Sequence, residues 1–176
     1  MRRQSAIAFI AIAALGTSLT AGAAWLGGFR VNLTPSEPLG LWRIVPMNRP
    51  VESGDLVFVC PPVTAFFHNA LERGYLRRGL CPGGFAPLIK SVVATSGQHI
   101  RIGARVVVDG TPVANSTVRA SDGKGRSVTP FPGGIVPSGF IFLHSSFASS
   151  YDSRYFGPVP VGGLLGLARP VLVYDP

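Results

Sequence analysis

The sequence predicts a mainly β fold that is attached to a membrane by one N-terminal helix. Three observations lead to this prediction: an uncharged N-terminal stretch, a series of short apolar runs bounded by turn-forming residues, and a high content of glycine and proline. The 176 residues include 22 glycines and 16 prolines, and both residue types weaken a helix interior. Hydrophobic residues make up 47% of the chain and charged residues 14%, which excludes a disordered chain and predicts a packed core.

The first predicted element is a helix that can cross a membrane. Arg2 and Arg3 precede residues 4–29, which carry no charged side chain, and residues 6–28 can span a hydrocarbon layer of about 30 Å. The two arginines should stay in the cytoplasm and leave the rest of the chain outside. Residues 1–28 are therefore a membrane anchor or an export signal. Small residues at 21–24 resemble a cleavage site, so a removed signal peptide that releases the domain is the alternative to a retained anchor.

The exported segment consists mainly of short strands. Runs rich in valine, isoleucine and phenylalanine predict strands at residues 40–45, 55–60, 88–95, 99–101, 105–108, 140–143 and 172–174. Asp109 and Gly110 supply a hairpin turn. Residues 64–73 predict one short helix, and residues 115–127, which are polar and contain glycine, predict a surface loop.

The charge balance is strongly basic. The net charge of +8 comes from 16 basic residues, 14 of them arginine, against 8 acidic residues. Beyond the N-terminus, Arg77 and Arg78 form the only adjacent pair, so no stripe of positive charge follows a phosphate backbone. We expect a basic surface that can lie near anionic lipid headgroups, and no nucleic-acid partner.

The cysteines agree with export. Cys60 and Cys81 are the only two, and both lie beyond the membrane segment. An oxidising compartment would join them and close a loop of roughly 22 residues, which contributes about 3 kcal/mol in the chain-entropy model. Two free core thiols are the alternative. The histidines are isolated and show no paired ligand spacing, so we expect no metal and no cofactor.

Most common catalytic motifs are missing from the sequence, including the Gly-x-Ser-x-Gly elbow, the P-loop and the dinucleotide fingerprint. Ser121 and Lys124 formally fit a Ser-x-x-Lys pattern, but Asp122 and Gly123 in a polar loop do not hold the helix that this pattern requires. Lys90 is a sharper candidate because it lies in an apolar strand, where burial can lower its pKa toward neutrality and let it accept a proton. The alternative is a lysine whose stem packs on the sheet while its ammonium reaches water.

Three segments, in this order, resemble the sequence boxes of a known peptidase family. Residues 32–42, Asn-Leu-Thr-Pro-Ser-Glu-Pro-Leu-Gly-Leu-Trp, look like its nucleophile box. Residues 88–97 are similar to its lysine box, and residues 151–159 resemble its C-terminal Asp-Ser-Arg-x-x-Gly box. The family is that of the TraF-type peptidases of bacterial conjugative transfer, a branch of the signal peptidase I superfamily. Further segments that look like the TraF branch specifically are residues 58–62, 72–75 and 81–84.

The resemblance implies an antiparallel β fold of the signal peptidase type and a Ser/Lys dyad. Ser36 matches the nucleophile and Lys90 the general base. The backbone N–H of Ser36 and the Thr34 hydroxyl match the donors that stabilise the tetrahedral oxyanion.

Three further residues of the C-terminal part match supporting positions of the family. Ser150 matches a hydroxyl that orients the lysine, and Asp152 matches a residue implicated in the TraF branch. Arg154 is expected to brace the site through an ion pair.

The implied function is that of a membrane-associated serine endopeptidase that processes a pilin precursor, by hydrolysis or by cyclisation, for conjugative plasmid transfer. Its partners would be this precursor or another exported peptide, the cytoplasmic membrane and the conjugative transfer (type IV secretion) apparatus. The peptidase domain, residues 29–176, would lie in the periplasm at the bacterial inner membrane. A general type I signal peptidase is one alternative, and a noncatalytic envelope scaffold of the transfer apparatus is another.

Overall fold

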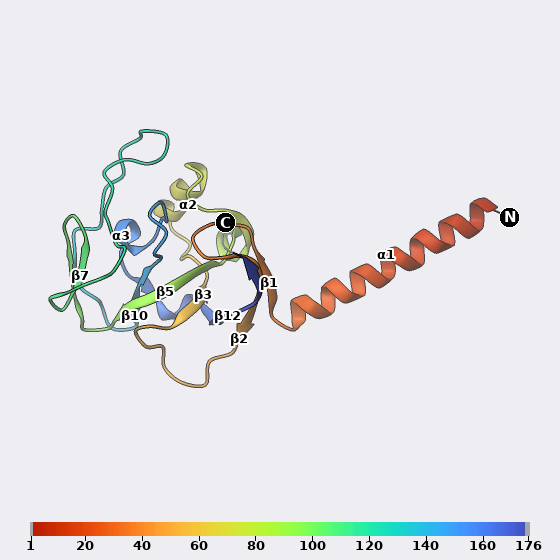
Figure 1. Ribbon diagram of the computed structural model, residues 1–176, viewed down its shortest axis with the longest axis horizontal. Helices are drawn as coiled ribbons and strands as arrows, with labels where there is room; N and C mark the ends of the chain where they lie inside the picture. The colour runs from red at the N-terminus through yellow and green to blue at the C-terminus, as the bar shows by residue number, and fades with distance from the viewer. Residues whose placement is uncertain (1, 175–176) are drawn as a thin grey trace.

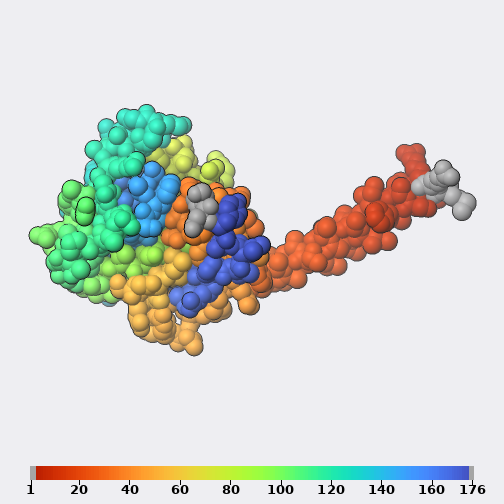
Figure 2. Space-filling model, viewed as in Figure 1, coloured from red at the N-terminus to blue at the C-terminus, as the bar shows by residue number. Residues whose placement is uncertain are grey.

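The computed structural model describes residues 2–174 of the chain and combines one long helix with a β domain. Helix α1 (Arg2–Leu26) stands away from the domain and, among the described residues, contacts it only near the end of the helix (Figures 1 and 2). Within the described residues, Arg3–Leu26 is the one helix long and apolar enough to cross a membrane. The helix predicted from the uncharged N-terminal stretch is therefore present.

A seven-stranded sheet forms the body of the domain among the described residues, and all its neighbouring strands pair antiparallel. The strands occur in the order β1 (Phe29–Asn32), β2 (Leu39–Val45), β12 (Leu164–Tyr174), β3 (Leu56–Val59), β5 (Leu88–Thr95), β10 (Phe140–His144) and β11 (Val159–Pro160).

A smaller sheet packs at one end of the body. Its four strands are β8 (Thr111–Pro112), β7 (Val106–Val108), β6 (His99–Ile102) and β9 (Gly134–Ile135), again antiparallel. The predicted hairpin turn joins β7 to β8, with Asp109 at φ 47° and Gly110 at φ 86°. Positive φ at both central residues is the geometry that the Asp-Gly pair favours.

The helix predicted at residues 64–73 is α2 (Ala65–Glu72). Its N-cap is Thr64, whose hydroxyl accepts a hydrogen bond from the N–H of Phe67, as helix N-termini require. The remaining elements are β4 (Arg78–Cys81), α3 (Ser153–Phe156) and the 3₁₀ turns η1 (Pro82–Gly84) and η2 (Val161–Gly163).

The expected disulfide joins Cys60 to Cys81, with their Cα atoms 5.6 Å apart. The segment that it closes contains α2, whose Phe67 and Ala70 are buried. These residues pack in the largest apolar cluster of the domain, together with Val57, Val92 and Leu143. The disulfide therefore holds α2 and the chain that follows it against the main sheet.

Strand β12 corrects the sequence prediction most strongly. A strand was expected only at residues 172–174, whereas the structure extends it over Leu164–Tyr174, between β2 and β3. Gly166, at φ 145°, lies against the carbonyl of Val45, and the pairing shifts again at Pro170. Glycine and proline normally indicate the end of a strand, but here they mark irregularities within a long one.

Candidate active site

The loop that carries Ser36 connects β1 to β2 and is held from inside by one side chain. Asn32, at the end of β1, is 8% exposed. Its amide nitrogen donates to the carbonyls of Thr34, Glu37 and Pro38 at 2.9–3.0 Å. Its amide oxygen accepts hydrogen bonds from the N–H and the hydroxyl of Thr34. A single buried amide therefore fixes the loop on both sides of Ser36.

Two further contacts fix the ends of this loop. The indole N–H of the buried Trp42 also donates to the Pro38 carbonyl, at 2.9 Å. On the other side, the Ser145 hydroxyl donates a short hydrogen bond to the carbonyl of Ser36. Among residues 2–174, no hydrogen bond is formed by the N–H of Ser36.

Lys90 is buried in the middle of β5, where it is 3% exposed and pairs with Val57 of β3. Desolvation lowers the pKa of the Lys90 ammonium from 10.5 to about 8, because burial penalises the charged form. The charges of Asp152 and Glu37 oppose this shift, and that of Arg154 adds to it. The alternative of an ammonium that reaches water does not hold in the structure.

Ser36 and Lys90 line the same cavity, which has a volume of about 200 Å³. Thr34 and Ser150 also line it, so the loop between β1 and β2, strand β5 and the segment before α3 meet there. No hydrogen bond joins Ser36 to Lys90 among the described residues, an open geometry that is common in sites without substrate. The Thr34 hydroxyl donates to Asn32 and must turn before it can donate to a bound oxyanion.

Asp152 and Arg154 form a fully buried ion pair beside this cavity, with no exposed surface on either side chain. Arg154 donates to both carboxylate oxygens of Asp152 at 2.8 Å, and further hydrogen bonds reach the carbonyls of Thr117 and Ser150. Although desolvation opposes it, the bond to Asp152 raises the pKa of Arg154. Arg154 thus braces the segment that carries Ser150.

Within the described part of the chain, two buried polar atoms near Lys90 have no hydrogen-bond partner: Ser150 Oγ and His144 Nε2. Ser150 Oγ belongs to the wall of the cavity that contains Lys90. Buried polar atoms are normally paired, so an unpaired hydroxyl at this wall is available to a neighbouring amine or a bound molecule.

Three residues of the site were not assigned a role from the sequence. Asn32 belongs to the segment that resembles the nucleophile box. Its position shortly before a proline-rich turn was the signal that the sequence offered. Ser145 connects two parts of the site, because its hydroxyl bonds the Ser36 carbonyl and its N–H donates to Asp152 at 3.1 Å. Desolvation raises the pKa of the half-buried Glu37, whereas the charge of Lys90 lowers it. No local pattern in the sequence indicates that Ser145 lies near Ser36 and Asp152, or that Glu37 lies near Lys90.

The discounted pair Ser121 and Lys124 lies elsewhere, in the predicted surface loop, and forms no helix. No group of three histidine, cysteine, aspartate or glutamate side chains within residues 2–174 is placed to hold a metal ion.

Comparison with known proteins gives the family. The model of the signal peptidases, peptidase S26, matches residues 2–173. The chain belongs to the signal peptidase family. Membership of peptidase S26 supports a serine peptidase of the signal peptidase type, with the antiparallel β architecture described above.

Two curated relatives of this peptidase S26 member are conjugal transfer proteins. It is 62% identical over 176 residues to the conjugal transfer protein TraF of Agrobacterium fabrum, and the match covers all of both chains. It is 37% identical over 178 residues to a plasmid transfer protein TraF of Escherichia coli, with 98% of this chain and 99% of the relative covered. The resemblance to the TraF branch is confirmed. Among solved structures, a signal peptidase I of Enterococcus faecalis aligns at 14% identity and a TM-score of 0.42, covering 68% of this chain and 97% of that chain.

Proposed function

We propose that this protein is a Ser/Lys serine endopeptidase that processes a pilin precursor for conjugative transfer at the periplasmic face of the bacterial inner membrane. The observation that carries the proposal is the shared cavity of Ser36 and the buried Lys90. With its pKa at about 8, the Lys90 amine is partly neutral near neutral pH, as a general base requires. The TraF relatives support the role in transfer.

The chemistry proceeds in two steps. Ser36 Oγ attacks the scissile carbonyl carbon and gives its proton to Lys90 Nζ, while the open N–H of Ser36 donates to the oxyanion. Lys90 returns the proton to the leaving amine, which departs as an acyl-enzyme forms on Ser36. Lys90 then takes a proton from the second nucleophile as that nucleophile attacks the acyl carbon, and Lys90 passes this proton to Ser36 Oγ as the bond from Ser36 to the acyl group breaks.

The second nucleophile decides the product. Water gives a linear, shortened pilin, whereas the pilin's own N-terminal amine gives a cyclic product that is one water lighter. Asp152 and Arg154 support the site by holding the segment around Ser150, and the unpaired Ser150 Oγ in the cavity that Lys90 lines supports a role in orienting the amine. In this proposal, α1 tethers the domain, residues 29–176, to the membrane, where the precursor is presented.

Mass spectrometry of a coexpressed pilin precursor tests the proposal. We expect shortening with the unchanged protein and with the control Ser138→Ala, an exposed serine away from the cavity. Ser36→Ala and Lys90→Met should give no shortening. Equal processing by all four proteins would exclude the dyad. A mating assay with Ser36→Ala separates a peptidase from a noncatalytic scaffold, because a scaffold would retain transfer.

A further inference from the structure

We propose that a basic cavity beside the candidate active site binds the carboxylate side chains of an acidic segment of the peptide substrate. This inference rests on the proposed peptidase function and adds a specificity site to it. The cavity has a volume of about 230 Å³. Four of its lining residues are cationic: Arg73, Arg119, Lys124 and Arg126.

Only one of the described lining residues is acidic, and its charge is already used. Asp122 accepts hydrogen bonds from the Tyr75 hydroxyl at 2.7 Å and from Arg126 Nε at 2.6 Å. Although desolvation acts in the other direction, these bonds and those from the backbone of Lys124 and Arg126 hold the pKa of Asp122 far below its ordinary value. Asp122 therefore remains ionised and neutralises only one of the four cations.

Two of the cations are free to bind a ligand. Among the described residues, no hydrogen bond or ion pair engages the guanidinium of Arg119 or the ammonium of Lys124; their hydrogen bonds involve only the backbone N–H groups. Arg126 and Arg73 are held in place by contacts with Asp122, Tyr75 and backbone carbonyls. The cavity thus combines a fixed basic wall with two cationic side chains whose charges are not paired among the described residues.

The basic cavity borders the candidate active site. Gly74, Tyr75, Ser149, Ser150 and Tyr151 line both it and the cavity of Ser36 and Lys90. An extended peptide bound at Ser36 can therefore place a side chain in the basic cavity.

A stack of tyrosines makes the wall between the two cavities rigid. Tyr151 and Tyr155 stack with their ring centroids 5.6 Å apart, and Tyr75 lies 4.6 Å from Tyr151. The Tyr75 hydroxyl donates a hydrogen bond to Asp122. The Tyr155 hydroxyl accepts one from the backbone N–H of Arg119. The basic loop is therefore fixed to the wall of the candidate active site, as a specificity site requires.

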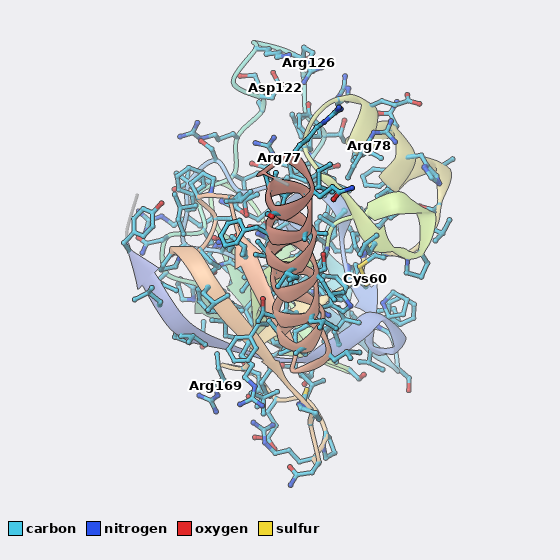
Figure 3. The ribbon with its side chains drawn as sticks, turned by 90° about the vertical axis from the view of Figure 1, so that its right-hand side faces the viewer. Cys60, Arg77, Arg78, Asp122, Arg126 and Arg169 are labelled. Atoms are coloured by element: carbon cyan, nitrogen blue, oxygen red, sulfur yellow. A yellow bond between two sulfur atoms is a disulfide. The ribbon has the colours of Figure 1, made fainter. Side chains whose placement is uncertain are left out.

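The position of this loop favours a peptide over lipid headgroups. It projects from the domain beside α2 and α3, across the direction of α1 (Figure 1), and Asp122 and Arg126 lie near its tip (Figure 3). Because the basic cavity and the cavity of Ser36 share lining residues, a peptide in the active site passes directly beside this loop.

The test uses the full-length Ser36→Ala protein in neutral detergent, so that binding is measured without cleavage. The probes are two pairs of fluorescein-labelled, alanine-rich peptides. Within each pair, one peptide carries two glutamates and the other carries two glutamines at the same positions. These positions lie on the N-terminal side of a central Ala-Ala bond in the first pair and on its C-terminal side in the second pair. At low ionic strength, we expect the glutamate member of one pair to bind about fivefold more tightly, the effect of two partly exposed ion pairs.

Two double variants in the Ser36→Ala background identify the site. Arg119→Gln with Lys124→Gln should abolish the preference for glutamate. Arg101→Gln with Arg105→Gln removes two exposed arginines that do not line the cavity and should retain the preference. Equal binding of both members in both pairs would overturn the inference, as would a preference that survives the first double variant.

Vesicles that contain phosphatidylglycerol test the competing hypothesis that the cavity binds lipid headgroups. Vesicle binding that requires Arg119 and Lys124, without any preference among the peptides, would assign the cavity to lipid and overturn the inference. Failure of the pilin assay with a retained glutamate preference would reject the peptidase function but leave an acidic-peptide site. Pilin processing without a glutamate preference would retain the function and reject this site.

Discussion

At the scale of single residues, the site depends on an amine that is buried among charges of both signs. Desolvation is the largest influence and lowers the pKa of Lys90 to about 8, against the opposing charges of Asp152 and Glu37. The lysine therefore loses its proton at a pH about 2.5 below that at which a lysine in water does. This environment makes Lys90 suitable as a base and at the same time costs folding free energy.

Replacing Glu37 by glutamine should move the pH profile of peptidase activity. The Glu37 carboxylate raises the pKa of Lys90, so its loss should lower that pKa. The neutral amine would then be available at lower pH. We expect the acidic limb of kcat/KM to shift to lower pH. The control Glu52→Gln, an exposed partner of Arg49, should leave the limb in place; a shift to higher pH for Glu37→Gln would contradict this electrostatic account.

Replacing Lys90 by methionine should stabilise the fold while removing activity. The pKa of Lys90 is about 8 in the folded state, against an ordinary 10.5, so the unfolded chain binds more protons between these values. The stability of the unchanged protein must then rise from pH 8 to pH 10.5, by about 3 kcal/mol. Urea unfolding should show Lys90→Met to be the more stable protein at pH 7, with an advantage that falls by about this amount by pH 11. An advantage that is independent of pH would mean that Lys90 is not desolvated as a cation.

At the scale of elements, the loop between β1 and β2 is positioned by Asn32. This side chain lies beneath the loop and bonds three of its carbonyls, while Trp42 and Ser145 hold the loop from either side. Only a side chain with both donors and an acceptor can make these bonds.

Asn32→Ala should therefore reduce both peptidase activity and stability. Without the amide, the loop can shift, and a displacement of about 1 Å at a nucleophile costs about 10²-fold in rate. We expect kcat/KM to fall by about this factor. The lost hydrogen bonds should lower the free energy of unfolding by about 1–3 kcal/mol. Asn48→Ala, at an exposed position, serves as the control. Unchanged kcat/KM in Asn32→Ala would show that the loop keeps its position without Asn32.

The elements also show why the sequence predicts some features and not others. Strand β5 was predicted at its observed bounds, Leu88–Thr95, because a mainly apolar run that follows a proline and ends shortly before a glycine is a local signal. The extent of β12 was not predictable, since its glycines and proline suggest turns when they are read locally. The bond from Ser145 to Ser36 spans 109 positions, and no periodicity in the chain records such a distant contact.

At the scale of the whole molecule, the end of α1 and the candidate active site are parts of one surface. An apolar groove of about 720 Å³ extends from Ala21 and Trp25 of α1 to Thr34 of the Ser36 loop. Arg30 lies 3.4 Å over the Trp25 ring and donates to the Trp25 carbonyl, which links β1 to the helix end. Tryptophan and arginine at this point are typical of a membrane–water interface. The site would therefore open close to the bilayer surface in the proposed orientation.

If α1 is a retained anchor, its loss should affect membrane-bound substrates selectively. A protein reduced to residues 29–176 keeps the Ser36 loop and β5, so we expect it to cleave a short soluble peptide at an unchanged rate. Processing of a membrane-inserted pilin precursor in proteoliposomes should fall at least tenfold, because tethering supplies an effective concentration that the free domain lacks. An unrelated polyleucine helix of equal length in place of residues 2–26 should restore it. Equal processing by the free domain and the full chain would contradict the anchor and favour a cleaved export signal, which N-terminal sequencing of the mature protein would reveal directly.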